Sequence, residues 1–135
     1  MAAYLVDTCA VIWIANGDRL REPAASVLRD ARTESLVVSP ISAWEVATLV
    51  AKGKMALSIS PGIWFRRFCE LPGVALAEMP PSVLVASAGL PGAPPSDPAD
   101  RILLATAREF GYTLVTRDRK LLEYGRNGHV RVLEC

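Results

Sequence analysis

Short apolar runs alternate with helix-like stretches along the whole chain, and this alternation limits the possible folds more than any other feature. The runs have the length and character of buried strands, and they lie at residues 3–6, 36–39, 74–76, 113–116 and 130–133. Strands separated by helices pair in parallel through right-handed crossovers, with helices on both faces of the sheet. The pattern therefore predicts an α/β fold, a three-layer α/β/α sandwich with a central, mostly parallel sheet.

The helices between these runs are predicted from capping residues, prolines and glycines. Thr8 is expected to cap the first helix, and Ser42 with Glu45 three positions later has the form of a capping box for the third. A proline- and glycine-rich stretch, Gly89–Pro95, is either an ordered loop or a flexible lid. The predicted helices are 9–15, one from Pro23 through Ala31, 43–52, 61–71, 80–88, 98–110 and 118–124.

Size and composition indicate one soluble domain, residues 1–135, that covers part of its surface with a partner. The chain has 135 residues, a common size for one domain, and its hydrophobic fraction of 51% exceeds what a monomer of this size needs to bury. Three cysteines without a CxxC pair, and no export signal, favour a reducing cytoplasm. No apolar run is long enough to cross a membrane.

Acidic residues gather where the predicted strands end. Asp7 follows the first strand, Glu45 lies in the first turn of the helix after the second strand, and Asp118 follows the strand over 113–116. Asp97 and Asp100 lie in the first turn of the helix over 98–110. The carboxyl ends of parallel strands meet at one edge of a sheet, where α/β proteins place their sites. Helix capping is the favoured explanation for any one of these acids alone, but it leaves Asp7 unexplained if Thr8 caps the first helix.

Carboxylates that converge in one pocket repel one another, and a bound divalent cation is the usual remedy. Oxygen ligands alone indicate Mg²⁺ or Mn²⁺. The chain has one histidine, His129, which is expected to be a loop residue and neither a ligand nor a base. A metal would therefore supply most of the chemistry, by activating a water and stabilising charge on a phosphoryl group.

Missing motifs exclude or disfavour other proteins that handle phosphate. There is no GxxxxGK[ST], which excludes a P-loop NTPase, and no GxGxxG after the first strand, which disfavours a dinucleotide fold. A haloacid dehalogenase-type phosphotransferase would have a second aspartate where Cys9 stands. The acid pair and the lysine of a response-regulator receiver are not in place.

Four blocks resemble, in order and spacing, those of the PIN-domain ribonucleases, most closely the VapC toxins of bacterial toxin–antitoxin pairs. The blocks are YLVDTCA (4–10), SPISAWEV (39–46), DPADRILLATA (97–107) and LVTRD (114–118). Each is a weak signal alone, but four in order form a strong one. The resemblance covers essentially the whole chain and implies a PIN-like fold, RNA cleavage with Mg²⁺ or Mn²⁺, a homodimer and inhibition by a small antitoxin protein.

The resemblance also implies roles for individual residues. The acids that match the metal-holding and catalytic positions are Asp7, Glu45, Asp100 and, directly or through water, Asp118. Thr116 matches the hydroxyl residue that orients the acids; Thr8 and Ser42 are supporting neighbours, and so is Asp97, for which helix capping carries more weight than metal ligation. The family commonly has a histidine shortly before the Asp97 position, where this chain has Pro94-Pro95-Ser96, so no substrate contact is carried over from it.

These observations leave two alternatives to a metal-dependent endoribonuclease toxin. One is a non-catalytic PIN-like module that binds RNA or a protein and uses its acids only as caps. The other, ranked lowest for so short a chain, is a metal-dependent phosphatase or flap-type DNA nuclease. Candidate contacts to RNA phosphates are Lys52, Lys54, Arg66, Arg67 and Arg117. Trp64, Phe65 and Phe68 belong either to the core or to a groove for the second subunit or the antitoxin.

Overall fold

The structure is a computed structural model that describes residues 3–17, 22, 24–26 and 36–135. The strands of these ranges form one parallel sheet in the order β3-β2-β1-β4-β5. The predicted parallel α/β architecture is confirmed. The elements in chain order are β1 (Tyr4–Val6), α1 (Thr8–Ala15), β2 (Leu36–Val38), α3 (Pro40–Ala51), α4 (Pro61–Cys69), β3 (Val74–Leu76), α5 (Pro81–Ala88), α6 (Pro98–Phe110), β4 (Thr113–Thr116), α7 (Arg119–Arg126) and β5 (Arg131–Glu134).

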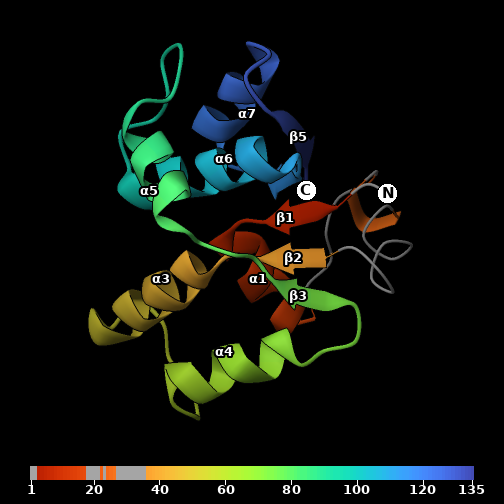
Figure 1. The fold of residues 1–135 in the computed structure, drawn as a ribbon. Helices are drawn as coiled ribbons and strands as arrows, with labels where there is room; N and C mark the ends of the chain where they lie inside the picture. Colours follow the sequence, from red (N-terminus) through yellow and green to blue (C-terminus); the bar gives the residue numbers. More distant parts are fainter. Residues whose placement is uncertain (1–2, 18–21, 23, 27–35) are drawn as a thin grey trace.

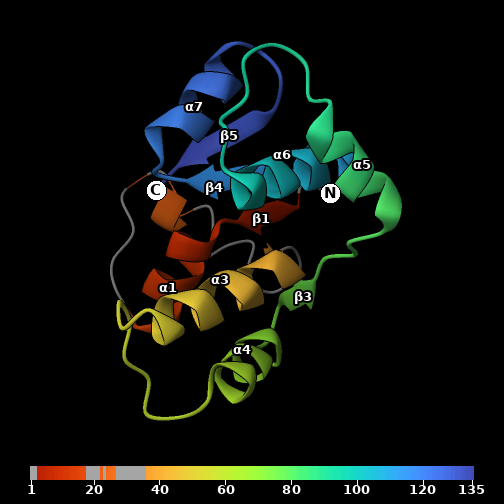
Figure 2. The same cartoon turned by 90° about the vertical axis from the view of Figure 1, so that its left-hand side faces the viewer.

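Helices cover both faces of the sheet, in three layers. In Figures 1 and 2, α5, α6 and α7 lie in the upper half of the molecule, and α1, α3 and α4 lie in the lower half. Successive side chains of a strand point to opposite faces. Leu5 accordingly packs in a cluster with residues of α6 and α7, and the next residue, Val6, packs with residues of α1 and α4. Two apolar cores therefore hold the sheet in place.

The first helix begins one residue earlier than the sequence predicts. Asp7, and not Thr8, is the N-cap of α1: its carboxylate accepts the backbone N–H of Ala10 at 2.8 Å. Aspartate and threonine both cap helices well, and here the aspartate takes the position that ends β1. The hydroxyl of Thr8, which this leaves free of a capping role, bonds to side chains of α3.

The capping box predicted for α3 is also wrong. Ser39 is the N-cap, and its hydroxyl accepts the backbone N–H of Ile41 at 3.1 Å. Pro40 then occupies the first helical position, which suits its fixed φ and its missing N–H. The helix starts early enough that Ser42 lies in its first turn and Glu45 in the second.

Other helix ends agree closely with the sequence. Asp97 and Asp118 cap α6 and α7, and α6 ends at Gly111, whose φ of 72° is the left-handed conformation that favours glycine. Of the helix predicted from Pro23, residues 24–26 are helical and the rest of the prediction lies outside the described residues. Among the described helices, none has the length and apolar character needed to cross a membrane.

The aromatic cluster of α4 belongs mainly to the core. Phe65 and Phe68 are buried against the sheet, and the ring of Trp64 stacks on Phe68 with 6.5 Å between centroids. The core interpretation is therefore confirmed for the two phenylalanines.

The stretch Gly89–Pro95 is an ordered loop. The guanidinium of Arg101 donates to the main-chain carbonyls of Ser87, Ala88 and Pro95, at 2.8, 3.1 and 3.2 Å. One side chain of α6 therefore ties both ends of the loop to the same point.

Candidate active site

The topology brings the predicted acids to one edge of the sheet. β1 and β4 are neighbours, and the backbone N–H of Asp7 extends their pairing by donating to the carbonyl of Val115 at 3.1 Å. Because both strands end at this edge, Asp7 emerges beside Thr116 and Asp118. The first turn of α6 contributes Asp100, and α3 contributes Glu45.

Asp7 is the most firmly held of the acids. It is 6% exposed, and while one carboxylate oxygen caps α1, the other accepts the hydroxyl proton of Thr116 at 2.5 Å. Burial raises the pKa of Asp7 above its ordinary value, although the hydrogen bonds from Thr116 and Ala10 lower it. A cation next to this buried carboxylate would stabilise its charged form.

Glu45 is oriented by a chain of hydroxyl groups. Thr8 donates its proton to a carboxylate oxygen of Glu45, and its oxygen lies 2.9 Å from the hydroxyl oxygen of the fully buried Ser42. A threonine hydroxyl has one proton, so Ser42 must be the donor to Thr8. Burial raises the pKa of Glu45, the hydrogen bond from Thr8 lowers it, and the charges of Asp97 and Asp7 raise it further.

Asp100 shows the repulsion within the cluster most clearly. Burial, followed by the charges of Asp97, Asp118, Glu45 and Asp7, raises its pKa from 3.8 to about 7. Asp97 caps α6 by accepting the backbone N–H of Asp100 at 3.0 Å. The residue that begins the helix therefore also adds negative charge beside Asp100.

Asp118 completes the edge from the side of β4. Its carboxylate caps α7 by accepting the backbone N–H groups of Lys120 and Leu121, at 2.8 and 3.1 Å. Its own N–H donates to the hydroxyl oxygen of Thr116 at 3.0 Å. Thr116 therefore contacts both aspartates and fixes their relative position.

The acids line one cavity of about 280 Å³. Arg117 is the one basic residue among the described residues that line it. The guanidinium carbon of Arg117 lies 3.7 Å from the ring centroid of Trp13, and its Nε donates to the carbonyl of Cys135 at 3.0 Å. The lining residues are Asp7, Thr8, Cys9, Trp13, Glu45, Asp100, Leu103, Arg117 and Asp118.

The donor chemistry of this cavity fits a hard divalent cation. Four carboxylates share it with one guanidinium, and their mutual repulsion is what a cation would relieve. Cys9 adds little, because burial and the nearby acids raise the pKa of its thiol to about 11. Within the described ranges, no three His, Cys, Asp or Glu side chains lie close enough together to enclose an ion, so the acids surround a cavity without converging on one point.

The structure places most of the predicted site residues on this cavity. Asp7, Glu45, Asp100, Asp118 and Thr8 line it, while the predicted supporting residues Ser42, Thr116 and Asp97 lie just behind and hydrogen-bond to residues that do. His129 lies in the turn after α7, as expected.

Sequence reasoning did not include Cys9, Trp13 and Leu103 in the site. Cys9 and Trp13 are four residues apart on α1 and so share one helix face, but the sequence does not say which face of α1 meets the cavity.

Comparison with known proteins gives one consistent family. The sequence profile of the PIN domain matches residues 4–127. The chain is 36% identical over 122 residues to Ribonuclease VapC22 of Mycobacterium tuberculosis. The aligned region covers 90% of this chain and 91% of the relative.

Solved structures share the fold. VapBC2 from Rickettsia felis, bound to a promoter DNA fragment, superposes with a TM-score of 0.68 at 15% identity, over 98% of each chain. DNA-bound VapBC from Salmonella typhimurium superposes with a TM-score of 0.63 at 18% identity, over 99% of this chain and 98% of the other.

Proposed function

Because the chain belongs to the PIN-domain family and is related to its VapC ribonucleases, we propose that it is a metal-dependent endoribonuclease and the toxin of a toxin–antitoxin pair. The observation that supports this best is the cavity at the carboxyl edge of the sheet. Four acids from different parts of the chain line it, and hydroxyl groups hold two of them in place. Helix capping alone does not explain why four acids that repel one another line the same cavity.

The metal would be Mg²⁺ or Mn²⁺, held by Asp7, Glu45, Asp100 and Asp118. When bound, such an ion lowers the pKa of a water and stabilises the charge that develops on a phosphoryl group. The chain's own residues prepare the site. Thr116 fixes Asp7, Thr8 with Ser42 fixes Glu45, and Asp97 fixes the first turn of α6, on which Asp100 stands.

Arg117 is the residue best placed to meet the substrate. It lines the acidic cavity, and its contact with the Trp13 ring and its hydrogen bond to Cys135 hold the guanidinium in place. An RNA phosphate that enters the cavity would otherwise meet only negative charge. We therefore assign Arg117 the contact to a phosphate next to the bond that is cut.

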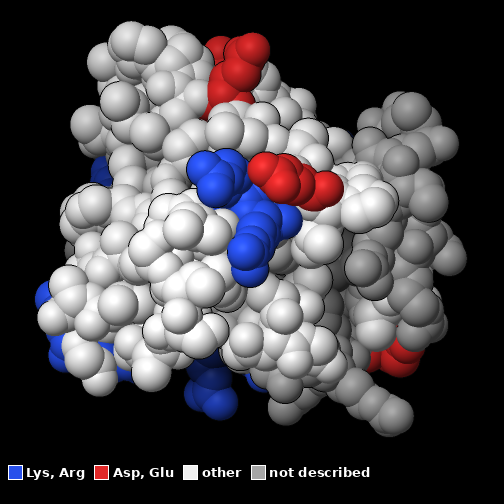
Figure 3. All heavy atoms as spheres, turned by 90° about the horizontal axis from the view of Figure 1, so that it is seen from below, with Lys and Arg blue, Asp and Glu red and all other residues white. Residues whose placement is uncertain are grey.

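The basic residues of α4 are weaker candidates for RNA contact. Figure 3 shows basic and acidic atoms side by side on the lower face of the molecule, where α4 lies in Figure 1. Arg66 lies 3.9 Å from Glu70, and both side chains are exposed, so the charge of Arg66 is partly cancelled at little gain in stability.

The proposal extends to partners and location. Solved relatives of this fold include a toxin–antitoxin complex from Klebsiella pneumoniae, which supports an antitoxin partner here. Exposed apolar side chains on α3, β3 and α5, among them Trp44, Leu76 and Val85 at 60%, 55% and 74% exposure, support a partner-covered surface and a homodimer of single-domain subunits. The three free cysteines fit a reducing cytoplasm.

RNA cleavage by the purified protein tests the activity. We expect cleavage with Mg²⁺ or Mn²⁺, its loss on chelation, and a fall of at least about a hundredfold in kcat/KM for Asp7→Asn and Asp100→Asn, because each change removes charge from the metal site. Glu109→Gln is the matched control: it removes a carboxylate from an exposed position of the same helix as Asp100. Undiminished cleavage by both aspartate variants would contradict the assignment. Binding of RNA without any cleavage would favour the non-catalytic module.

A further inference from the structure

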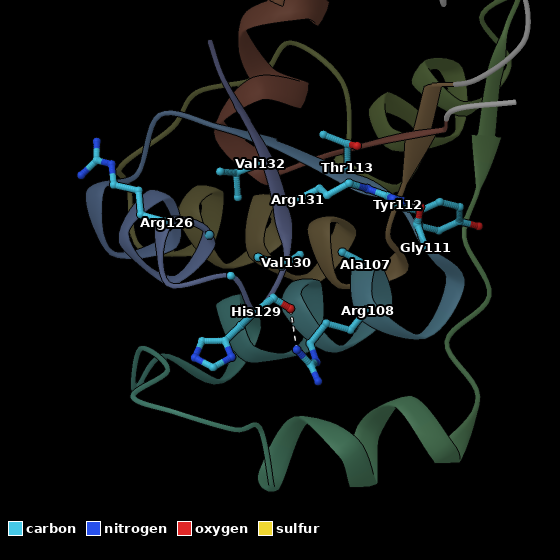
Figure 4. Close-up of a pocket in the computed structure, with 12 residues that line it drawn as sticks. Ala107, Arg108, Gly111, Tyr112, Thr113, Arg126, His129, Val130, Arg131 and Val132 are labelled. Carbon is cyan, nitrogen blue, oxygen red and sulfur yellow. Dashed lines mark hydrogen bonds between the residues drawn. The ribbon is translucent and has the colours of Figure 1, made fainter.

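A second, larger cavity lies at the opposite edge of the sheet from the candidate active site. It has a volume of about 850 Å³ and lies between the last turns of α6 and α7 and the first residues of β4 and β5 (Figure 4). Thr113 and Arg131 are the first residues of these two parallel strands, whereas Asp118 follows the last residue of β4 by two positions. The two cavities therefore lie at opposite ends of β4, and α6 borders both: Leu103 lines the acidic cavity, and Ala107, about one helical turn further on, lines the larger one.

Two arginines give this cavity an uncancelled positive charge. Arg108 donates to the carbonyl of His129 and Arg131 to the carbonyl of Gly111. A neutral carbonyl fixes a guanidinium without removing its charge, and each guanidinium keeps N–H donors for another acceptor. None of the described residues that line the cavity is an Asp or Glu.

Arg126 also lines the cavity, but it differs from these two. Its guanidinium lies 3.4 Å from a carboxylate oxygen of Glu123, and Figure 4 shows the side chain pointing away from the other labelled residues. It therefore serves as a control within the same part of the molecule.

An aromatic ring lies at one end of this basic cavity. Arg131 extends toward Gly111 and Tyr112, and Tyr112 packs against Phe110 with 5.8 Å between ring centroids. Tyr112 is half-buried and Phe110 is 38% exposed. Fixed arginines beside accessible ring surface are the combination with which proteins bind single-stranded nucleic acid, through phosphate contacts and base stacking. An acidic peptide would use the arginines but would gain nothing specific from the ring.

The acidic cavity itself gives a reason for a distant binding site. An RNA chain that approaches four carboxylates and one arginine is repelled there until a cation is bound. Affinity for the polyanion must then come from basic groups elsewhere on the surface.

We propose that the cavity between α6, α7, β4 and β5 is a second binding site for the substrate, where Arg108 and Arg131 hold backbone phosphates of single-stranded RNA away from the bond that is cut. This inference rests on the proposed ribonuclease function. It assigns to the enzyme a single-stranded substrate long enough to reach both edges of the sheet.

Binding of two labelled RNAs in a chelator, measured by fluorescence anisotropy, tests the proposal. One RNA is long enough to span both cavities, and the other is too short. For the double variant Arg108→Gln/Arg131→Gln we expect about tenfold weaker binding of the long RNA. The slope of log K against log salt concentration should be smaller in magnitude by about 1.4, which is about 0.7 for each lost phosphate contact. Binding and Mg²⁺-dependent cleavage of the short RNA should not change.

Two further variants separate charge from fold. Arg126→Gln removes a charge of the same cavity that Glu123 already balances in part, and should weaken binding of the long RNA far less than the double Gln variant does. Arg108→Lys/Arg131→Lys keeps the charge and should retain most of the affinity for the long RNA. In the wild type, the long RNA alone should slow amide exchange over residues 108–113 and 126–132, which tests the site without any substitution.

Three results would overturn the second site. They are wild-type affinity of the double Gln variant for the long RNA, an equal loss for both RNAs, and tighter Arg108/Arg131-dependent binding of polyglutamate than of RNA. If the wild type cleaves no RNA but the long RNA still requires both arginines, the ribonuclease assignment fails and the RNA site stands.

Discussion

Two threonine hydroxyls determine how the acids face the cavity. Thr116 donates to one oxygen of Asp7, whose other oxygen caps α1, and Thr8 donates to one oxygen of Glu45. Both hydrogen bonds lower the pKa of their carboxylate, but burial has the larger effect and raises it. The hydroxyls therefore orient charges that the fold alone makes unfavourable.

Arg117 should affect substrate binding more than stability. Among the described residues, Arg117 is the one positive charge that lines the acidic cavity. Replacing it by Gln should therefore raise KM for RNA and lower kcat/KM by about tenfold or more. Arg117→Lys keeps the charge but loses the planar stack on Trp13, and an intermediate value is expected. Steady-state cleavage of a defined RNA measures both. Arg119→Gln, which removes an exposed charge two residues further on, is the control, and equal kcat/KM for the Gln variants at 117 and 119 would refute the role.

The acids of the site could be predicted from sequence because the rule that locates them depends only on strand direction. Asp7 and Asp118 follow parallel strands, and any parallel sheet brings such residues to one edge. Trp13 is different: which face of α1 meets the cavity depends on how the helix packs against its neighbours. No local pattern contains that rotation, so the stacking of Arg117 on Trp13 could not be predicted.

At the level of elements, the errors occurred where two good capping residues compete. Ser42 with Glu45 satisfies the capping-box pattern, but Ser39 followed by Pro40 satisfies a different start pattern, an N-cap serine before a proline. The same Ser-Pro pair begins α4 at Ser60. Proline decides the case, because it is unfavourable within a strand and favourable at the first helical position. Asp97 stands directly before Pro98, so the same rule selects it over Ser96, and there the prediction was correct.

The loop between α5 and α6 should depend on Gly92. Its φ is +71°, and a Cβ there would lie 2.4 Å from Nε2 of His129, whose ring stacks on Tyr124 at 4.6 Å. Gly92→Ala should therefore lower the free energy of unfolding by about 1–3 kcal/mol, from backbone strain and displacement of His129. Denaturant titration measures this. The control, Gly89→Ala, meets open space and has an ordinary φ of −119°, so a similar loss at both positions would contradict the explanation.

At the scale of the whole molecule, the formal net charge of +1 conceals two regions of opposite sign. The carboxyl edge of the sheet carries four acids around one arginine, and the amino edge carries Arg108 and Arg131 without a lining acid in the described residues. A balanced total therefore says little about partners. The arrangement presents a cation site and an anion site at opposite ends of the same strands.

The acids at the carboxyl edge make the stability of the protein dependent on pH and on divalent cations together. In a chelator, the folded state holds the proton of Asp100 up to a pKa of about 7, whereas the unfolded chain releases it near 3.8. Between these values the folded state binds more protons, so the free energy of unfolding should fall as pH rises. Saturating Mg²⁺ should reverse the fall near neutral pH, by about 2.7 kcal/mol at a hundredfold excess over its dissociation constant. Denaturant midpoints across this pH range, with and without Mg²⁺, measure both effects. Asp100→Asn should flatten the pH dependence of the free energy of unfolding and reduce the gain from Mg²⁺, whereas Glu109→Gln should change neither. Identical pH slopes for Asp100→Asn and the wild type would show that Asp100 does not cause the pH dependence.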